Sequence, residues 1–567
     1  MSFGRRRRDV EPVVHDAVVV LEGAASLPPG GSGTVRAWVV SPDELPRSLR
    51  PEAVFTLLEG DRIVGRAELL EVLADPAPQP LADLRAAKRR RLVPAAMLET
   101  PMADAVDAFL AAGDTSFSLP GHKRAAWLDD PLLALDVALV PGADDAQLSG
   151  DVLGRAERLA ASLWGADHCR FSVAGSTMAN QALALAVAAP GDRVAVSRTL
   201  HRSLFSGLVL SGLAPVWMQA DVDPATGLTV GVPVEEVAAA LEQDVRAVFL
   251  VEPSYTGVLS DVAAIAELAH EAGVPLVVDQ AWGAHLGLGP PMPRNAMQCG
   301  ADAMVVSAHK TLTSFTQAAL CLASGERLDL RRVDAAFDAL HTTSPSAAIH
   351  ASIDRTRRLM ATEGPRLLAA AAGLARRFRE EVGAIDGVHV LDGAVVERFP
   401  SAAAVDPLKL VVSLAGTGAD GFAVERDLLR AGVRLEMADR DTLVPILTVA
   451  DDEDGVERLI VALRGSLEAR RAEPRPVAAS TAWRVRPQTA MSPREAFFAA
   501  SELVDAGDAI GRVCAELAAP YPPGIPALAP GEVVTEEVVR ALQAEAAAGT
   551  RLAYCADPAL RRVLVVA

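Results

Sequence analysis

A lysine that directly follows an apolar segment is the residue whose placement most strongly suggests chemistry. Residues 301–306 predict a short buried strand, and Ser307, His309, Lys310 and Thr311 follow it. Burying an ammonium group is costly unless it is paired or neutralised, so a lysine in this place has its pKa pulled down. A neutral lysine amine can form a Schiff base with an aldehyde, whereas the simpler alternative is a lysine in a surface loop.

An aspartate at the end of another apolar segment supports the Schiff-base interpretation. Residues 274–278 predict a buried strand, and Asp279 stands at its carboxyl end. Ligands of open parallel sheets bind beyond the carboxyl ends of the strands. Pyridoxal phosphate needs a lysine for its aldehyde and a carboxylate for its pyridinium nitrogen, so Lys310 and Asp279 together fit this cofactor. A lone aspartate at a strand end would more often be an ordinary cap or turn residue.

Two further groups of residues could complete a cofactor site. Gly175, Ser176 and Thr177 follow a predicted strand and open a predicted helix. Free backbone N–H groups, two hydroxyls and the helix dipole converge at such a turn, which suits a phosphate group, although many helices begin with Ser or Thr as a simple cap. His201 follows the predicted strand 193–197, where its imidazole could stack on a cofactor ring, or remain a solvated side chain.

The elements that must position these residues predict a multidomain α/β protein. The first 75 residues contain short β-rich segments between Gly, Pro and charged turns, which favours a small β-barrel or sandwich. Strands then alternate with helices, which is typical of a mostly parallel sheet. A long helix is expected over 347–382, interrupted near Gly364 and Pro365. We predict an N-terminal β domain (1–75), a linker (76–92), a large cofactor-binding domain (93–335), a small α/β domain (336–471) and a C-terminal α+β domain (472–567).

Composition narrows the possible functions. The 567 residues carry a net charge of −19, so nucleic acid is an unexpected partner, and we interpret the basic runs Arg5–Arg8 and Lys88–Arg91 as a solvated tail and a charged linker. The five cysteines are scattered without a CxxC pair, which argues against a metal site and fits a reducing compartment. No apolar run is long enough to span a membrane, and no apolar signal core follows the N-terminal arginines. We therefore expect a cytoplasmic protein.

Seven motifs in order resemble the Orn/Lys/Arg decarboxylase family of fold-type I pyridoxal phosphate enzymes. The resemblance covers roughly residues 95–567, and the core looks like the short Gram-positive-type members with an extra N-terminal β domain. It implies an aspartate aminotransferase-like large domain and a homodimer or higher homo-oligomer with shared active sites. The motifs lie at residues 120–123, 175–180, 201–203, 279–285, 307–311, 342–346 and 520–526.

The resemblance also implies roles for individual residues. Lys310 would carry the cofactor, Asp279 would hold the pyridinium nitrogen, and His201 would stack on the ring, so these three are the expected catalytic residues. The implied cofactor-binding residues are Gly175, Ser176, Thr177, His201, Asp279, Ala281, Ser307, His309, Lys310 and Ser344, the last acting on a neighbouring subunit. The implied substrate-binding residues are Ser118, His122, Trp282, Glu495 and Tyr521.

The expected reaction is decarboxylation of lysine, arginine or ornithine to the amine and carbon dioxide. Three departures from the family pattern bear on the substrate. Gln280 stands where the family usually has Glu, Ser118 stands where histidine is common, and Arg124 and Ala125 stand in place of small glycines. Two alternatives remain open, namely another pyridoxal phosphate reaction, such as transamination or aldolase-like cleavage, and a non-catalytic cofactor-binding scaffold. A Lys310→Ala change should abolish turnover under either enzymatic hypothesis, but not under the scaffold hypothesis.

Overall fold

The computed structural model describes residues 94–567 apart from 116, 138–150, 225, 478–481 and 522–523, together with the backbone of five strands in the first 93 residues. The chain divides into two compact units, Met1–Ala95 and Ala96–Ala567. No helix in the described part of the chain has the length and apolar character needed to cross a bilayer.

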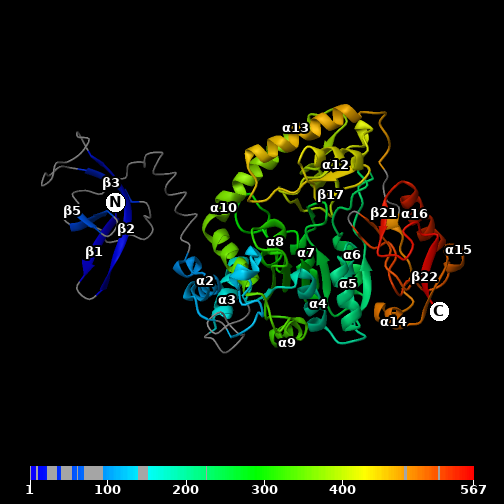
Figure 1. Cartoon of the computed structure of the whole chain (residues 1–567), viewed down its shortest axis with the longest axis horizontal. Coiled ribbons are helices and arrows are strands. Elements are labelled where there is room, and N and C mark those ends of the chain that lie inside the picture. The colour runs from blue at the N-terminus through cyan, green and yellow to red at the C-terminus, as the bar shows by residue number, and fades with distance from the viewer. Residues whose placement is uncertain are drawn as a thin grey trace. The chain divides into compact units, whose positions relative to one another are not determined.

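The first unit contains one antiparallel five-stranded sheet with the strand order β3-β2-β1-β4-β5 (Figure 1). The expected β-rich N-terminal region is therefore confirmed, but the solvated tail at Arg5–Arg8 is wrong in part, because Arg5 to Arg7 belong to β1 and pair with β2. The strands are Ser2–Arg7 (β1), Val10–Leu21 (β2), Val35–Val39 (β3), Val54–Glu59 (β4) and Arg62–Glu68 (β5).

The second unit is built around a seven-stranded sheet with the order β6-β13-β12-β11-β9-β7-β8. The pairs from β12 through β11, β9 and β7 to β8 are all parallel, whereas β13 is antiparallel to both of its neighbours. This confirms the expected mostly parallel sheet. The strands are His168–Ser172 (β6), Arg193–Ser197 (β7), Ala214–Met218 (β8), Val248–Val251 (β9), Leu276–Asp279 (β11), Ala303–Val306 (β12) and Ala319–Ala323 (β13).

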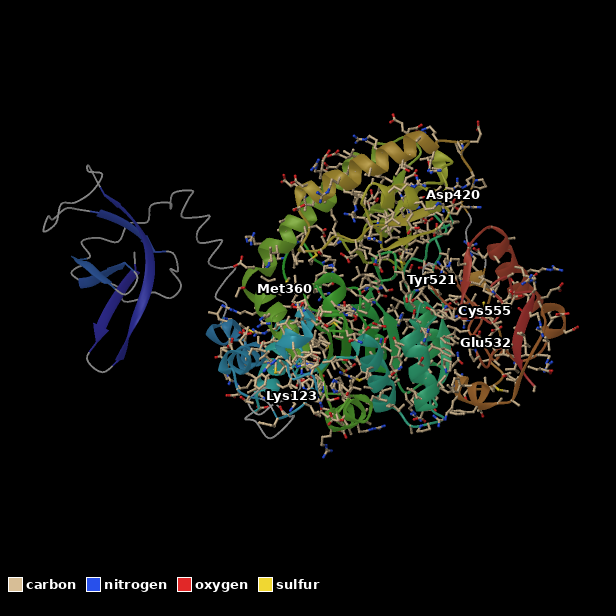
Figure 2. The ribbon with its side chains drawn as sticks, viewed as in Figure 1. Lys123, Met360, Asp420, Tyr521, Glu532 and Cys555 are labelled. Carbon is tan, nitrogen blue, oxygen red and sulfur yellow. The ribbon has the colours of Figure 1, made fainter. Side chains whose placement is uncertain are left out.

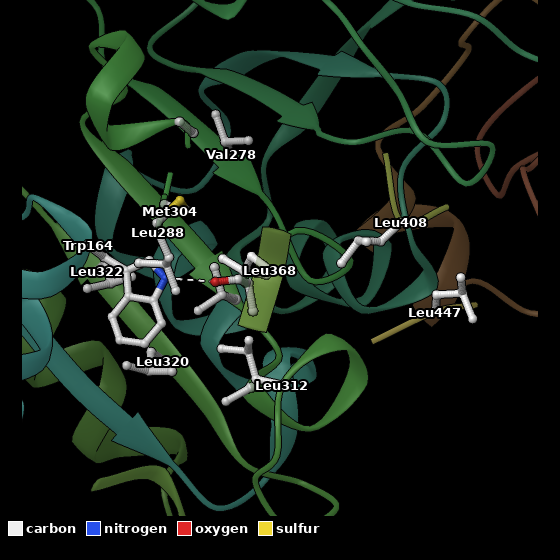
Figure 3. Packing of buried hydrophobic residues seen from close by; sticks show 14 of the residues in the cluster. Trp164, Val278, Leu288, Met304, Leu312, Leu320, Leu322, Leu368, Leu408 and Leu447 are labelled. Carbon is white, nitrogen blue, oxygen red and sulfur yellow. Dashed lines mark hydrogen bonds between the residues drawn. The ribbon is translucent and has the colours of Figure 1, made fainter. Parts of the chain in front are cut away.

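Helices cover both faces of this sheet, and the side chains of each strand alternate between two apolar layers. In β11, Leu276 and Val278 belong to one layer and Val277 belongs to the other. Helices α3, α6, α7 and α10 pack on the first face and α4, α5 and α9 on the second. Their bounds are Val152–Trp164 (α3), Gly175–Val187 (α4), Arg202–Ser211 (α5), Val234–Leu241 (α6), Val262–Glu271 (α7), Leu330–Leu340 (α9) and Ala347–Gly383 (α10). We call this part the large lobe; Figure 3 shows the first layer.

Helix α10 leads from the large lobe into a small lobe, which contains the four-stranded antiparallel sheet β14-β16-β18-β17 and helices α12 and α13 (Figure 1). The expected interruption of this helix is wrong, because α10 continues through Pro365. The backbone at Pro365 supports the turn at Gly289, where an added Cβ would lie 3.0 Å from the proline ring. The elements are His389–Val390 (β14), Val412–Ser413 (β16), Met437–Ala438 (β17), Thr442–Val444 (β18), Gly421–Arg430 (α12) and Glu453–Arg470 (α13).

The C-terminal lobe, residues 482–567, has its own apolar core around helix α16 and two antiparallel strand pairs, β19-β22 and β20-β21. Glu532 and Cys555 lie within this lobe, and Tyr521 lies at its edge toward the rest of the unit (Figure 2). The elements are Pro493–Phe498 (α14), Ser501–Asp505 (β19), Ala506–Ala509 (α15), Ala519–Tyr521 (β20), Glu536–Ala547 (α16), Arg551–Ala553 (β21) and Arg562–Val566 (β22).

Candidate active site

Lys310 lies at the carboxyl-terminal edge of the large sheet. Strand β12 ends at Val306, and the short helix Ala308–Thr311 (α8) begins after the turn at Ser307. Burial lowers the pKa of the Lys310 amine, and the negative charges of Asp279 and Glu436 oppose this shift. A lowered pKa increases the neutral fraction that can attack an aldehyde, which agrees with the expected Schiff-base chemistry.

Asp279 is held at the same edge by the parallel pairing of β11 with β12, in which it lies opposite Val305. Its side chain is 4% exposed. The carboxylate accepts a hydrogen bond of 2.7 Å from Asn180 Nδ2 and another of 3.1 Å from the Ala281 N–H. These two donors fix the carboxylate in one orientation, as binding a protonated pyridine nitrogen requires.

A chain of hydrogen bonds connects Asp279 to His201. Asn180 Nδ2 also donates to Ser203 Oγ at 3.1 Å, and Ser203 Oγ pairs with His201 Nδ1 at 2.8 Å. His201 caps α5, accepting the Ser203 N–H at Nδ1, and burial lowers its pKa even though the charge of Asp279 raises it. The imidazole is therefore held neutral and oriented next to the aspartate.

The opposite end of the site presents hydrogen-bonding groups that suit a phosphate. Gly175 has a φ of +72°, and a Cβ added there would meet no atom within 4 Å, so its backbone faces open space. Ser176 is buried at the start of α4. The hydroxyls of Ser307 and Thr311 are buried, and no hydrogen-bond partner for them lies among the described residues. Buried hydroxyls without partners are costly, so these two groups fit a ligand that accepts hydrogen bonds.

His309 and Ala281 complete this arrangement. His309 Nδ1 pairs with the Ala318 carbonyl at 2.8 Å, which fixes the ring, and burial lowers the pKa of the imidazole. Ala281 is 7% exposed and follows Asp279 after one intervening residue. Lysine, carboxylate, neutral histidine and phosphate cradle thus fit pyridoxal phosphate, the cofactor that the sequence predicts.

A second lysine, Lys409, contacts the same tryptophan ring as Lys310, that of Trp282. Lys310 Nζ is 4.3 Å from the centroid of the Trp282 ring, and Lys409 Nζ is 3.7 Å from the same centroid. Sequence reasoning did not select Lys409. Its only sequence signal is a lysine between Leu408 and Leu410 in an otherwise apolar segment.

Comparison with known proteins agrees with this geometry. The model of the Orn/Lys/Arg decarboxylase major domain matches residues 100–455, and that of the family's C-terminal domain matches residues 477–552.

The chain belongs to the Orn/Lys/Arg decarboxylase family.

It is 31% identical to the arginine decarboxylase of Bacillus subtilis and 32% identical to that of Halalkalibacterium halodurans; each alignment spans 82% of this chain and 98% of the relative. The structure of lysine decarboxylase A from Pseudomonas aeruginosa superposes with a TM-score of 0.71 at 20% identity, over 87% of this chain and 83% of that one. This likeness confirms the expected fold class, and pyridoxal phosphate is the family's cofactor.

Two of the predicted substrate residues, Glu495 and His122, make hydrogen bonds to residues outside the predicted site. Glu495 accepts hydrogen bonds of 2.8 Å from both the backbone N–H and the hydroxyl of Ser492, which forms a capping box at the start of α14. His122 Nε2 pairs with Asp136 at 3.0 Å, and Ser118 is exposed in the same segment. The substrate roles of these three residues remain predictions.

Ser344 and Tyr521 lie in different lobes of the unit, and their site roles remain predictions. Ser344 is exposed in the loop between α9 and α10. Tyr521 is 36% exposed, and its charge contributes to the raised pKa of Tyr255, whose largest cause is burial and whose second is the charge of Asp279. Tyr255 therefore connects the cofactor end of the site with the C-terminal lobe.

A buried ion pair fastens the C-terminal lobe next to His201. Arg198 follows β7 directly and is 3% exposed, while its partner Glu532 is 1% exposed. The guanidinium donates to both Glu532 oxygens, at 2.5 and 2.9 Å, and to the carbonyls of Pro526 and Ala527. Pro526, the last residue of the 520–526 motif, is thus joined to the strand end that leads to His201.

Proposed function

We propose that this protein decarboxylates a basic amino acid, and arginine before lysine or ornithine, to the corresponding amine and carbon dioxide. The observation that carries the proposal is the placement of Lys310, with its lowered pKa, beside the buried and oriented Asp279. Arginine is favoured because arginine decarboxylases match over 98% of their own length, whereas the lysine decarboxylase of Pseudomonas aeruginosa is 24% identical over 65% of its length.

In this proposal each side chain has one task toward the cofactor. Lys310 holds the aldehyde carbon, Asp279 keeps the pyridine nitrogen protonated, and His201 and Ala281 enclose the ring. The phosphate group of the cofactor is bound by Gly175, Ser176, Thr177, Ser307 and His309. Ser344 of a neighbouring subunit is proposed to bind the same phosphate. When bound, pyridoxal phosphate supplies the electron sink for the pair of electrons that the departing carboxylate leaves behind.

The protein's own residues supply orientation and charge. Asn180 holds the Asp279 carboxylate in position, so the negative charge faces the ring nitrogen without reorganisation. The neutral His201 would add no positive charge beside that nitrogen, and the buried side chains of Asn180, Ser203 and Asp279 would keep water away from it.

A pocket beside Tyr255 is suited to the distal cation of the substrate. Its lining includes the carboxylates of Asp439, Asp441 and Glu545 but a single guanidinium, that of Arg440. Burial raises the pKa of Asp439 to about 6, and hydrogen bonds from the Asp441 and Thr442 amides oppose this shift. Asp441 already pairs with Arg440 at 2.7 Å and with Arg475 at 2.8 Å. Asp439 is therefore the carboxylate that supports a guanidinium or ammonium group as the occupant of this pocket.

A homodimer with shared active sites is the proposed working unit. The segment that carries Ser118 and His122 exposes large apolar side chains to an unusual degree: Phe117 is 91% exposed, Trp127 83% and Leu132 81%. Exposed apolar groups of this size are typical of a surface that another protein covers. A second copy is the proposed cover, because the same segment and the exposed Ser344 hold the predicted site residues that lie outside the Lys310 cluster.

The proposed location is the cytoplasm. All five cysteines are free thiols, and burial raises the pKa of the thiols of Cys169, Cys321 and Cys514, which keeps them in the unreactive protonated form. This pattern supports a reducing compartment.

The test is a product assay by mass spectrometry. Purified protein loaded with pyridoxal phosphate is incubated separately with arginine, lysine and ornithine, with Lys310→Ala as the control. Agmatine should form fastest, and the control should form no amine. A protein that binds the cofactor but yields no agmatine, cadaverine or putrescine would contradict the proposal, and a keto acid would instead indicate transamination.

A further inference from the structure

Lys409 is a buried lysine whose backbone is fixed on the border of the small lobe. It is 3% exposed, bridges to Ile446, and its carbonyl accepts a hydrogen bond of 2.9 Å from Arg379. Its side-chain stem passes over the backbone of Gly257, where an added Cβ would lie 2.6 Å from the Lys409 Cβ. The direction of this side chain, toward Trp282 and Lys310, is therefore set by packing.

The ammonium group of Lys409 has no hydrogen-bond acceptor among the described residues. The nearest buried carboxylate, that of Asp406, already pairs with His285 Nε2 at 2.9 Å and with the Leu408 N–H at 2.9 Å. Burial lowers the pKa of Lys409 to about 8, while Asp406 and Glu436 raise it and Lys310 lowers it. At neutral pH this group is thus mainly a buried cation that contacts the Trp282 ring but has no hydrogen-bonded counter-ion among the described residues, and a buried charge without a counter-ion is unfavourable.

The position of the Lys409 ammonium group indicates which negatively charged group can pair with it. Both Lys409 Nζ and Lys310 Nζ lie within 4.3 Å of the Trp282 ring centroid. The α-amine of an amino acid substrate takes the place of the Lys310 amine, and the α-carboxylate is attached to the next carbon. An amino acid bound in this way brings a full negative charge close to the Trp282 ring, which both ammonium groups contact.

We propose that Lys409 binds the α-carboxylate of the substrate. The inference rests on the proposed function, because it requires an amino acid whose amine reacts where Lys310 stands. Its task is positioning: a carboxylate held by Lys409 fixes the rotation about the bond from the α-carbon to the amine, and so decides which bond faces the electron sink.

The positive charge of Lys409 should affect KM and kcat to different degrees. A cation stabilises the bound carboxylate more than the transition state, in which that negative charge moves away from the carboxyl group. Lys409 therefore contributes more to substrate affinity than to the rate of the chemical step. Loss of the charge should raise KM for the amino acid by a larger factor than it lowers kcat.

The test compares a ligand that has the carboxylate with one that lacks it. The cofactor-loaded wild type, Lys409→Met and Lys409→Arg are mixed rapidly with arginine or with agmatine, and the dissociation constant is taken from the cofactor absorbance change before turnover. Because a hydrogen bond to a charged group is strong, Lys409→Met should weaken arginine binding about 10- to 100-fold. Agmatine binding should stay within about twofold of wild type, and Lys409→Arg should keep most of the arginine affinity.

Three results are decisive. Equal weakening of arginine and agmatine would overturn the inference, because it would place Lys409 against the cofactor and not against the carboxylate. Unchanged arginine binding in Lys409→Met would overturn it as well. Binding of neither ligand by wild type would contradict the proposed function itself, and with it the inference. Methionine matches the lysine stem in length and removes only the unpaired charge, so the variant should fold with a melting temperature at or above that of wild type.

Discussion

The ion pair between Arg198 and Glu532 provides a quantitative prediction about the C-terminal lobe. Arg198→Met removes four hydrogen bonds, two of them to the Glu532 carboxylate, and the stacking on Trp217 at 4.7 Å. The carboxylate would keep the Ala529 N–H as a partner but lose its counter-ion at 1% exposure. Breaking a buried pair from one side costs about 3–5 kcal/mol, because an uncompensated charge remains in the interior.

This cost should appear as local opening of the segment that contains residues 524–532. Its amides at Ala527 and Leu528 donate to the Ala518 carbonyl, so their hydrogen exchange reports on whether the segment stays docked. At about 1.4 kcal/mol per factor of ten, the expected loss accelerates their exchange by roughly 10²- to 4 × 10³-fold. Activity should fall with it, because Arg198 lies three residues before His201.

The double variant Arg198→Met with Glu532→Leu is the matched control. Removing both charges leaves no uncompensated charge in the interior, so exchange in the double variant should be slower than in the single variant. It should stay faster than in wild type, because the Pro526 and Ala527 carbonyls and the Ala529 N–H lose these two side chains as partners. Exchange unchanged by Arg198→Met alone, or as fast in the double variant as in the single one, would refute this reasoning.

Two shorter predictions concern the site and the response to acid. Asn180→Leu removes the 2.7 Å hydrogen bond to Asp279 and should weaken pyridoxal phosphate binding about tenfold, measured by fluorescence titration of the apoprotein; unchanged affinity would contradict the role of Asn180. His350 is buried, and burial lowers its pKa to about 3 from 6.5. The unfolded state therefore binds a proton that the folded state does not, so stability should fall by about 1.4 kcal/mol for each pH unit below 6.5. His350→Phe should flatten this part of the pH dependence of urea unfolding, and an unchanged slope would show that another group is responsible.

The positions of Asp279 and Lys310 could be predicted from the sequence, because each residue lies at or just after the carboxyl end of a buried strand. Apolar segments 274–278 and 301–306 indicate buried parallel strands, and the carboxyl ends of such strands meet at one edge of a sheet. Asp279 and Lys310 are therefore brought together by topology alone. The two apolar layers on either face follow from the same fact, since strands that are covered on both sides contain near-continuous apolar residues.

Other parts of the site depend on contacts that the sequence does not encode locally. Asn180 reaches Asp279 across 99 residues, and Lys409 reaches Trp282 from a different lobe, so no local pattern marks either as a site residue. Glu495 shows the opposite case, because Ser492 and Glu495 have the spacing of a capping box, and that local signal accounts for its hydrogen bonds in the structure. The long helix was expected to be interrupted near Gly364 and Pro365, but α10 continues through Pro365, which lies against the turn at Gly289.

The most direct measurement for the central claim is to locate the cofactor covalently. The protein loaded with pyridoxal phosphate is reduced with borohydride, digested and mapped by peptide mass spectrometry. The account predicts a phosphopyridoxyl group on Lys310, none on Lys409, and no modified peptide from Lys310→Ala. Modification of Lys409 in the wild type, or of neither lysine, would contradict it.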